Sequence, residues 1–189
     1  MSSLSEAFKE KRFRKKVKQN LPLIMKKSDK ESKKFGKTGM EKGLVRKRNL
    51  IDFFIDHFGE NNVDVTDSPR IDIKINSQPV KIKTITGKGG IKIKWTVDPK
   101  KVESILNEYT PSCGILLIRL NWGMKVKNIP SGFFWIPIEA QQRVIKRLGL
   151  LKYLKPPKRG TNSRGVELTK EALNNLLSDR ETIHIDINW

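Results

Sequence analysis

An aspartate and two lysines occur in the segment 70–84, RIDIKINSQPVKIKT, at positions where they can act together. Apolar and polar residues alternate on both sides of the turn-forming residues 76–79, which predicts a β-hairpin with one apolar and one polar face. Because side chains alternate along a strand, Asp72 lies on the polar face of the first strand, and Lys81 and Lys83 lie on the matching face of the second. This set is either a solvated ion pair of small energetic value or part of a site.

A carboxylate and a lysine beside a bound polyanion have the chemistry that phosphodiester hydrolysis requires. A divalent metal ion polarises the phosphoryl oxygen and activates water, and Mg²⁺ binds through one or two carboxylates while keeping several waters. A neighbouring lysine can orient or deprotonate that water and offset the charge of the transition state. On this hypothesis Asp72 is a metal ligand, Lys83 is the catalytic lysine, and Glu41 is a second metal ligand.

Glu41 is a candidate because of the helix that is predicted before the hairpin. From Met40 onward the sequence has helical periodicity, until Gly59 ends it. Its apolar stripe comprises Leu44, Ile51, Ile55 and Phe58, widened by Val45 and Phe54. Extending the stripe back by one turn from Leu44 leads to Glu41, so we expect this carboxylate to face a site rather than solvent.

The rest of the chain is predicted to combine strands and helices around the hairpin. Residues 4–20 suit a short basic helix with a weak apolar stripe, and residues 26–39 have the composition of a mobile basic linker. After the hairpin, the expected elements are strand 91–97, helix 99–109, strands 114–120 and 133–138, helices 139–148 and 170–177, and strand 182–187. This order indicates an α/β domain over residues 40–189, with a mixed central β-sheet flanked by helices, preceded by a basic arm and linker over residues 1–39.

Composition indicates nucleic acid as the partner. The 189 residues carry a formal net charge of +19, and residues 1–48 hold 17 Lys and Arg against 5 Asp and Glu. Basic side chains placed on phosphates release condensed counterions, whereas a membrane surface is disfavoured because few aromatic residues and leucines are interleaved with them. The sequence has no apolar run of membrane-spanning length, no signal peptide core and only one cysteine, which predicts a cytoplasmic protein.

Other kinds of active site have no support in the sequence. Cys113 is the single cysteine, and His57 and His184 are isolated, so there is no zinc-binding spacing. The glycine-rich run at 87–90 lacks the spacing of a nucleotide-binding loop, and no Ser-His-Asp set is indicated.

The helix ending near Phe58, the hairpin RIDIKINSQPVKIKT and the following strand IKIKW resemble the core of the PD-(D/E)XK nuclease superfamily. The later segments FFWIP, PPKRGTNSRGVELTKEAL and IHIDINW resemble the closing part of small type II restriction endonucleases of the ThaI type, which cut CG-rich sites. The resemblance implies a restriction-endonuclease-like core in which Asp72 takes the metal-binding position and Lys83 that of the catalytic lysine. It also implies that residues 40–189 are a nuclease domain with DNA-recognition elements in its C-terminal part.

One position departs from that pattern. The superfamily has Asp or Glu two residues before the lysine, where this chain has Lys81. In some members the carboxylate migrates to the preceding helix, which favours Glu41, with Asp52 and Asp56 as alternatives. If no carboxylate reaches Asp72, metal affinity falls, and an inactive relative becomes an alternative to an active enzyme.

Basic and amide side chains elsewhere are candidate DNA contacts. The expected set is Met40, Lys81, Lys92, Lys94, Gln141, Gln142, Arg143, Lys158, Arg159, Asn162 and Arg164. Arg pairs with guanine, and Gln or Asn with adenine, in the major groove, although contacts to phosphates alone would carry no sequence information. Met40 either wedges between base steps, which the resemblance to ThaI-type enzymes makes worth testing, or acts as a hydrophobic staple for its helix.

These observations predict a Mg²⁺-dependent endonuclease of double-stranded DNA. We expect a type II restriction enzyme that acts as a homodimer on a short palindromic site, with a cognate DNA methyltransferase as its genetic partner. The alternatives are a structure-selective nuclease similar to junction resolvases and a non-enzymatic basic DNA- or RNA-binding protein. Discrete plasmid fragments would indicate the restriction enzyme, and cutting confined to branched DNA would indicate the structure-selective nuclease. The absence of any metal-dependent cleavage would indicate the binding protein.

Overall fold

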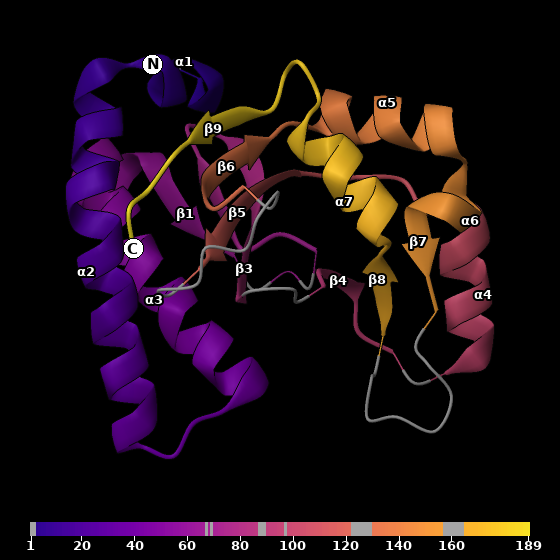
Figure 1. Cartoon of the computed structure of the whole chain (residues 1–189), viewed down its shortest axis with the longest axis horizontal. Coiled ribbons are helices and arrows are strands. Elements are labelled where there is room, and N and C mark those ends of the chain that lie inside the picture. Colours follow the sequence, from indigo (N-terminus) through magenta and orange to yellow (C-terminus); the bar gives the residue numbers. More distant parts are fainter. Residues whose placement is uncertain are drawn as a thin grey trace. The chain divides into compact units, whose positions relative to one another are not determined.

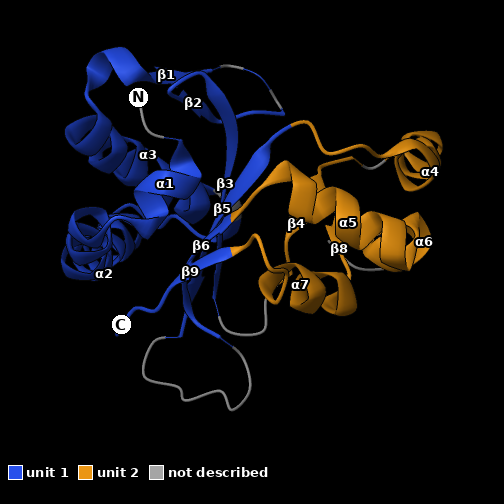
Figure 2. Ribbon diagram, turned by 90° about the horizontal axis from the view of Figure 1, so that it is seen from above, with its two compact units in different colours: residues 1–87, 113–135, 183–189 blue, residues 88–112, 136–182 orange. Residues whose placement is uncertain are grey.

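The computed structural model describes residues 3–66, 68, 70–86, 90–96, 98–121, 130–156 and 165–189. The chain divides into two compact units, which Figure 2 colours separately. Unit 1 comprises Met1–Gly87, Cys113–Trp135 and Ile183–Trp189, and unit 2 comprises Lys88–Ser112 and Ile136–Thr182. Residues on both sides of position 40, the predicted start of the nuclease domain, belong to unit 1.

Unit 1 combines a mixed β-sheet with the helices at the start of the chain (Figure 1). Its helices are α1 (Leu4–Lys9), α2 (Lys11–Lys34), α3 (Gly39–Phe58) and the 3-10 turn η1 (Glu60–Asn62). Its strands are β1 (Val63–Val65), β2 (Ile73–Ile75), β3 (Gln78–Thr86), β5 (Gly114–Leu120), β6 (Gly132–Ile136) and β9 (Ile183–Ile185). They follow the order β1-β2-β3-β5-β6-β9, with β3 and β5 parallel and the pairs β1/β2, β2/β3 and β6/β9 antiparallel. The predicted mixed sheet with flanking helices is confirmed.

The three N-terminal helices lie on one side of this sheet (Figure 2) and share its core. Phe8 of α1, Phe13 of α2 and Phe54 of α3 are each fully buried. The ring centroids of Phe8 and Phe13 are 5.3 Å apart, and that of Phe133 on β6 is 4.8 Å from Phe8. Burial of one such side chain contributes about 1.5–3 kcal/mol. The segment predicted as an arm is therefore part of the hydrophobic core.

The linker predicted over residues 26–39 is also wrong, because α2 continues to Lys34. The helix buries two small polar residues, Ser28 and Ser32, where an amphipathic pattern would have apolar ones. Each hydroxyl donates to the carbonyl four residues earlier at 2.7 Å, and Asn49 of α3 donates to the Ser28 hydroxyl at 2.8 Å. Small, internally satisfied side chains let α3 approach α2 closely, and the sequence does not show this as apolar periodicity.

Unit 2 holds the other helices and a small antiparallel sheet. Its helices are α4 (Pro99–Glu108), α5 (Ile138–Leu148), α6 (Leu150–Tyr153) and α7 (Lys170–Leu177). Its sheet has the order β4-β8-β7, from β4 (Lys92–Lys94), β8 (Val166–Leu168) and β7 (Leu154–Lys155). The Lys-rich strand after the hairpin therefore belongs to this sheet rather than to the central one. Within the part of the chain that the structure describes, no helix combines the length and apolarity needed to cross a membrane.

Candidate active site

The hairpin of β2 and β3 has the alternation that the sequence predicts. Asn76 and Ser77 have φ angles of 49° and 64°, which are typical of the two-residue turns that join hairpin strands. The register pairs Ile73 with Val80, and both side chains belong to the core that the helices cover. Polar side chains at alternate positions therefore lie away from that core.

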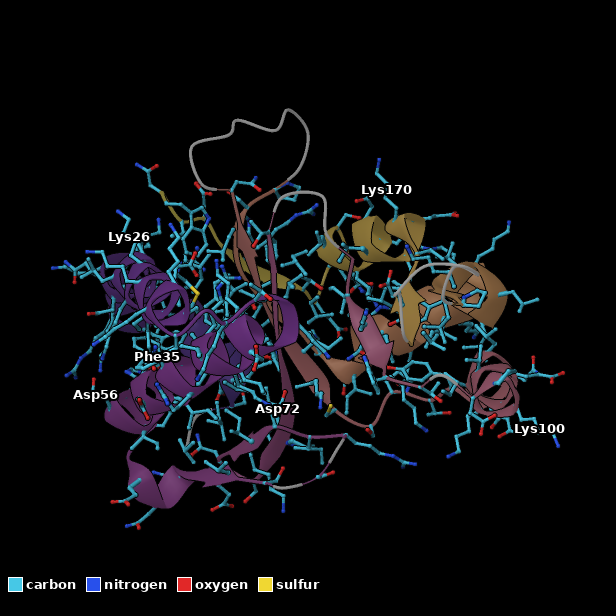
Figure 3. The ribbon with its side chains drawn as sticks, turned by 90° about the horizontal axis from the view of Figure 1, so that it is seen from below. Lys26, Phe35, Asp56, Asp72, Lys100 and Lys170 are labelled. Carbon is cyan, nitrogen blue, oxygen red and sulfur yellow. The ribbon has the colours of Figure 1, made fainter. Side chains whose placement is uncertain are left out.

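Asp72 immediately precedes β2, at the point where β3 continues beyond its pairing with β2, and it lies beside α3 (Figure 3). It is only 7% exposed. Its Oδ2 accepts the backbone N–H of Ile82 at 2.8 Å, and its Oδ1 accepts a hydrogen bond from Lys47 Nζ at 2.9 Å. Lys81 Nζ lies 3.4 Å from the same Oδ1. One carboxylate is thus held by one backbone group and two ammonium groups.

Burial and charge set the ionisation of this cluster. Burial by itself would raise the pKa of Asp72, but the hydrogen bonds from Lys47 and the Ile82 N–H, together with the Lys81 charge, bring this pKa below its ordinary value. Burial is the largest cause that lowers the pKa of Lys83 to about 8; the Lys81 ammonium acts in the same direction, and the Asp72 carboxylate opposes the shift. A lysine with a pKa near 8 is partly neutral near neutral pH, so Lys83 can accept a proton from water.

The structure does not bring Glu41 to Asp72. Glu41 is exposed and lines a shallow depression of α3 together with residues of the same helix and of the preceding turn. The two alternatives from the same helix are exposed as well, and Asp56 forms an ion pair with Lys16 at 2.7 Å. None of the three carboxylates predicted as a second ligand therefore contacts Asp72.

Lys47 is the residue of α3 that reaches Asp72. It is separated from Glu41 by six positions, which is about 9 Å along the helix axis and about 120° around it. Leu44 is 52% exposed, whereas Leu50 and Phe54 are fully buried, so the true buried stripe is rotated from the predicted one. Lys47 precedes Phe54 by seven positions and therefore lies on the true stripe. Extending the stripe back from Phe54, rather than from Leu44, would have found it.

The site offers a minimal donor set for a divalent metal ion. Asp72 supplies a hard carboxylate oxygen of the kind that Mg²⁺ prefers, and a single carboxylate suffices when phosphate oxygens and waters complete the coordination. Among the described residues, no three His, Cys, Asp or Glu side chains converge as a metal site. Asp72 would therefore serve as one ligand of a divalent ion whose other ligands are waters and phosphate oxygens.

Some of the candidate DNA contacts are exposed, whereas others are buried or engaged in ion pairs within the protein. Lys94 on β4 and Gln142 on α5 are exposed, and Lys92 is half-buried. Gln141, by contrast, is 1% exposed, so its side chain is not accessible to a base in this structure. Residues Lys158, Arg159, Asn162 and Arg164, and the side chain of Met40, lie outside the described residues.

Arg143, the remaining candidate, forms ion pairs with two carboxylates of unit 2. Its guanidinium donates to both carboxylate oxygens of Asp179, at 2.7 and 3.2 Å, and to Glu181 at 2.9 Å. The hydrogen bonds that Arg143 donates to Asp179 and Glu181 raise its pKa above the ordinary value. The predicted contact with guanine would require breaking this bidentate pair, so we assign Arg143 to the fold. Its partners lie 36 and 38 residues away in the sequence, where no local pattern indicates them.

Comparison with known proteins gives matches that extend over nearly the whole chain. A family model described as "Restriction endonuclease ThaI" matches residues 7–189. A solved structure described as "Restriction endonuclease in complex with substrate DNA" is 39% identical to this chain, with a TM-score of 0.88. That match covers 98% of this chain and 89% of the other. No curated protein matches the chain.

Proposed function

Because the chain belongs to the ThaI restriction endonuclease family, we propose that Asp72 and Lys83 form its DNA-cleaving site and that Mg²⁺ is its metal ion. Type II restriction enzymes act on DNA, and restriction endonucleases generally use divalent metal ions. The observation that carries the assignment is the buried Asp72 carboxylate beside Lys83, on a hairpin of the central sheet. The family match favours this assignment over a junction resolvase or a purely DNA-binding protein.

Each side chain of the site has a distinct task in this proposal. Asp72 would hold the metal ion through Oδ1, and the ion supplies Lewis acidity toward the phosphoryl oxygen. Lys83, whose pKa is about 8, accepts the proton of the attacking water at Nζ. The ammonium group of Lys81 offsets the negative charge that develops on the phosphate. With a metal ion held by Asp72, the Lys47 ammonium would no longer pair with Oδ1 and would be available to contact a phosphate.

The DNA contacts and the assembly follow from the same chemistry. We assign phosphate contacts to Lys81, Lys92 and Lys94, because ammonium groups bind phosphates as point charges, and we assign a base or phosphate contact to Gln142. Cutting both strands of a palindromic site requires two active sites, which a two-fold homodimer supplies. A DNA methyltransferase gene beside the gene for this chain would protect the host DNA.

Cleavage of plasmid DNA tests the site. With Mg²⁺ and unmethylated plasmid, the wild-type protein should give discrete fragments, and Asp72→Asn and Lys83→Met should give none while retaining DNA binding. Asp64→Asn on β1 is the matched control, because Asp64 is an exposed strand carboxylate of the same charge. Mg²⁺-dependent cutting by Asp72→Asn would refute the assignment. Sedimentation of the protein at twice the chain mass of 21.8 kDa would support the dimer.

A further inference from the structure

The acidic group of the site is outnumbered by basic ones. Lys47 and Lys81 both lie within ion-pair distance of Asp72 Oδ1, and the charge of Asp72 also acts on Lys83. Without DNA phosphates to complete the coordination, a divalent ion at Asp72 would have to overcome the charge of these ammonium groups. In the folded protein, ammonium groups therefore neutralise the Asp72 carboxylate, which is the one carboxylate of this cluster that could bind a metal ion.

Lys47 is the stronger of the two partners, and it comes from a separate element. Its Nζ is 2.9 Å from Oδ1, against 3.4 Å for Lys81. Its position on the buried stripe of α3 aims it at the hairpin, while its side chain remains 30% exposed. Arg46, the neighbouring residue, forms a different kind of pair: it is 6% exposed and donates through two nitrogens to Asp29 of α2. The Arg46 pair joins two helices, whereas the Lys47 pair lies on the reactive carboxylate.

We propose that Lys47 is an internal counter-cation that occupies the metal-binding oxygen of Asp72 in the metal-free protein and sets the metal affinity of the site. This inference rests on the assignment of Asp72 under the proposed function. An ammonium hydrogen-bonded to Oδ1 competes directly with a divalent ion for the same lone pairs, and the two cations repel each other at this separation. Metal ions should therefore bind weakly to the DNA-free protein, and removing the Lys47 charge should strengthen binding.

The position of Lys47 also allows a carboxylate to complete the site. A glutamate side chain is one bond shorter than that of lysine. Two metal–oxygen bonds of about 2.1 Å bridge a wider gap than the hydrogen bond that Lys47 makes now. Lys47→Glu would thus place a second carboxylate within reach of an ion held by Asp72. This substitution places a negative charge beside Asp72 Oδ1, whereas Lys47→Gln only removes the positive one.

Free Mn²⁺ can be measured by electron paramagnetic resonance during titration of the DNA-free protein. Lys47→Gln should bind Mn²⁺ about tenfold more tightly than wild type, because a charge-assisted hydrogen bond no longer opposes the ion. Lys47→Glu should bind about 100-fold more tightly. The matched control is Lys42→Gln, which removes the same charge from α3 but from a pair with Asp29 at 3.0 Å; its affinity should stay within about twofold of wild type. Thermal melting verifies that each variant is folded.

The outcomes separate this inference from the site assignment. If Asp72→Asn abolishes binding but Lys47→Gln binds Mn²⁺ no better than wild type, Lys47 is not a competitor and the inference is refuted. If Asp72→Asn binds as wild type does, the metal site itself is misplaced and both proposals fail. A gain that is equal in Lys47→Gln and Lys42→Gln would show a general field effect and would likewise overturn the specific role of Lys47.

Discussion

Asp72→Asn should destabilise the protein as well as inactivate it. Asparagine retains a side-chain oxygen for the Ile82 N–H but removes the negative charge that Lys47 and Lys81 share. A hydrogen bond to a charged group contributes about 1.5–3 kcal/mol, and the lower value applies because Lys47 is 30% exposed. The longer Lys81 contact adds less than about 1 kcal/mol. We therefore expect the free energy of unfolding to fall by about 2 kcal/mol at pH 7, or about 4–8 °C in the melting midpoint.

The stability difference between wild type and Asp72→Asn should depend on pH. The pKa of Asp72 in the folded protein lies below the ordinary value of 3.8, so the unfolded chain binds its proton first as the pH falls. The advantage of wild type over Asp72→Asn should be complete above about pH 5 and should shrink as the pH falls through 3.8 and then through the folded pKa.

Urea unfolding of both proteins at pH 7, 5 and 3 measures this difference directly. The exposed control Asp64→Asn should change the free energy of unfolding by less than about 0.5 kcal/mol at each pH. A wild-type advantage that is the same at pH 3 as at pH 7, or an Asp72→Asn variant more stable than wild type at pH 7, would refute the electrostatic account of the cluster.

Other variants test the fold and the second site residue. Lys83→Met should abolish cleavage yet raise the free energy of unfolding at pH 7, because the buried lysine is charged at that pH. The gain should disappear between about pH 8 and 10.5, where the folded lysine is neutral while the unfolded lysine is still protonated. Urea unfolding at pH 7 and at pH 10.5 measures the difference. Phe13→Ala should cost about 3–5 kcal/mol, because Phe13 is fully buried between the N-terminal helices; a loss below about 1 kcal/mol in urea unfolding would mean that this segment is a detachable arm. Gly114→Ala should prevent stable folding, because the added Cβ would lie 2.0 Å from the Trp135 ring, whereas Gly43→Ala on the open surface of α3 should raise the melting midpoint, since alanine stabilises a helix by about 1 kcal/mol relative to glycine.

The sequence by itself determined the features that depend on local alternation and turn chemistry. The hairpin follows from apolar residues at every second position around Asn76 and Ser77, and this alternation places Asp72 and Lys83 on its polar face. The buried strand 114–120 and the capped starts of α4 and α7 also follow from residues that are neighbours in the chain. The interactions that decide these features join residues that are close together in the sequence.

Only the tertiary structure decided which helix residue meets Asp72. The rotation of α3 about its axis depends on two partners at once, the sheet and α2. Its contact with α2 is made by polar groups such as Asn49 and Ser28, which an apolar pattern does not register. Lys47, which lies about 120° around the helix axis and about 9 Å along it from Glu41, is the residue that meets Asp72. The charge beside Asp72 thus depends on which of two possible stripes of α3 packs on the sheet, and the spacing within the helix does not choose between them.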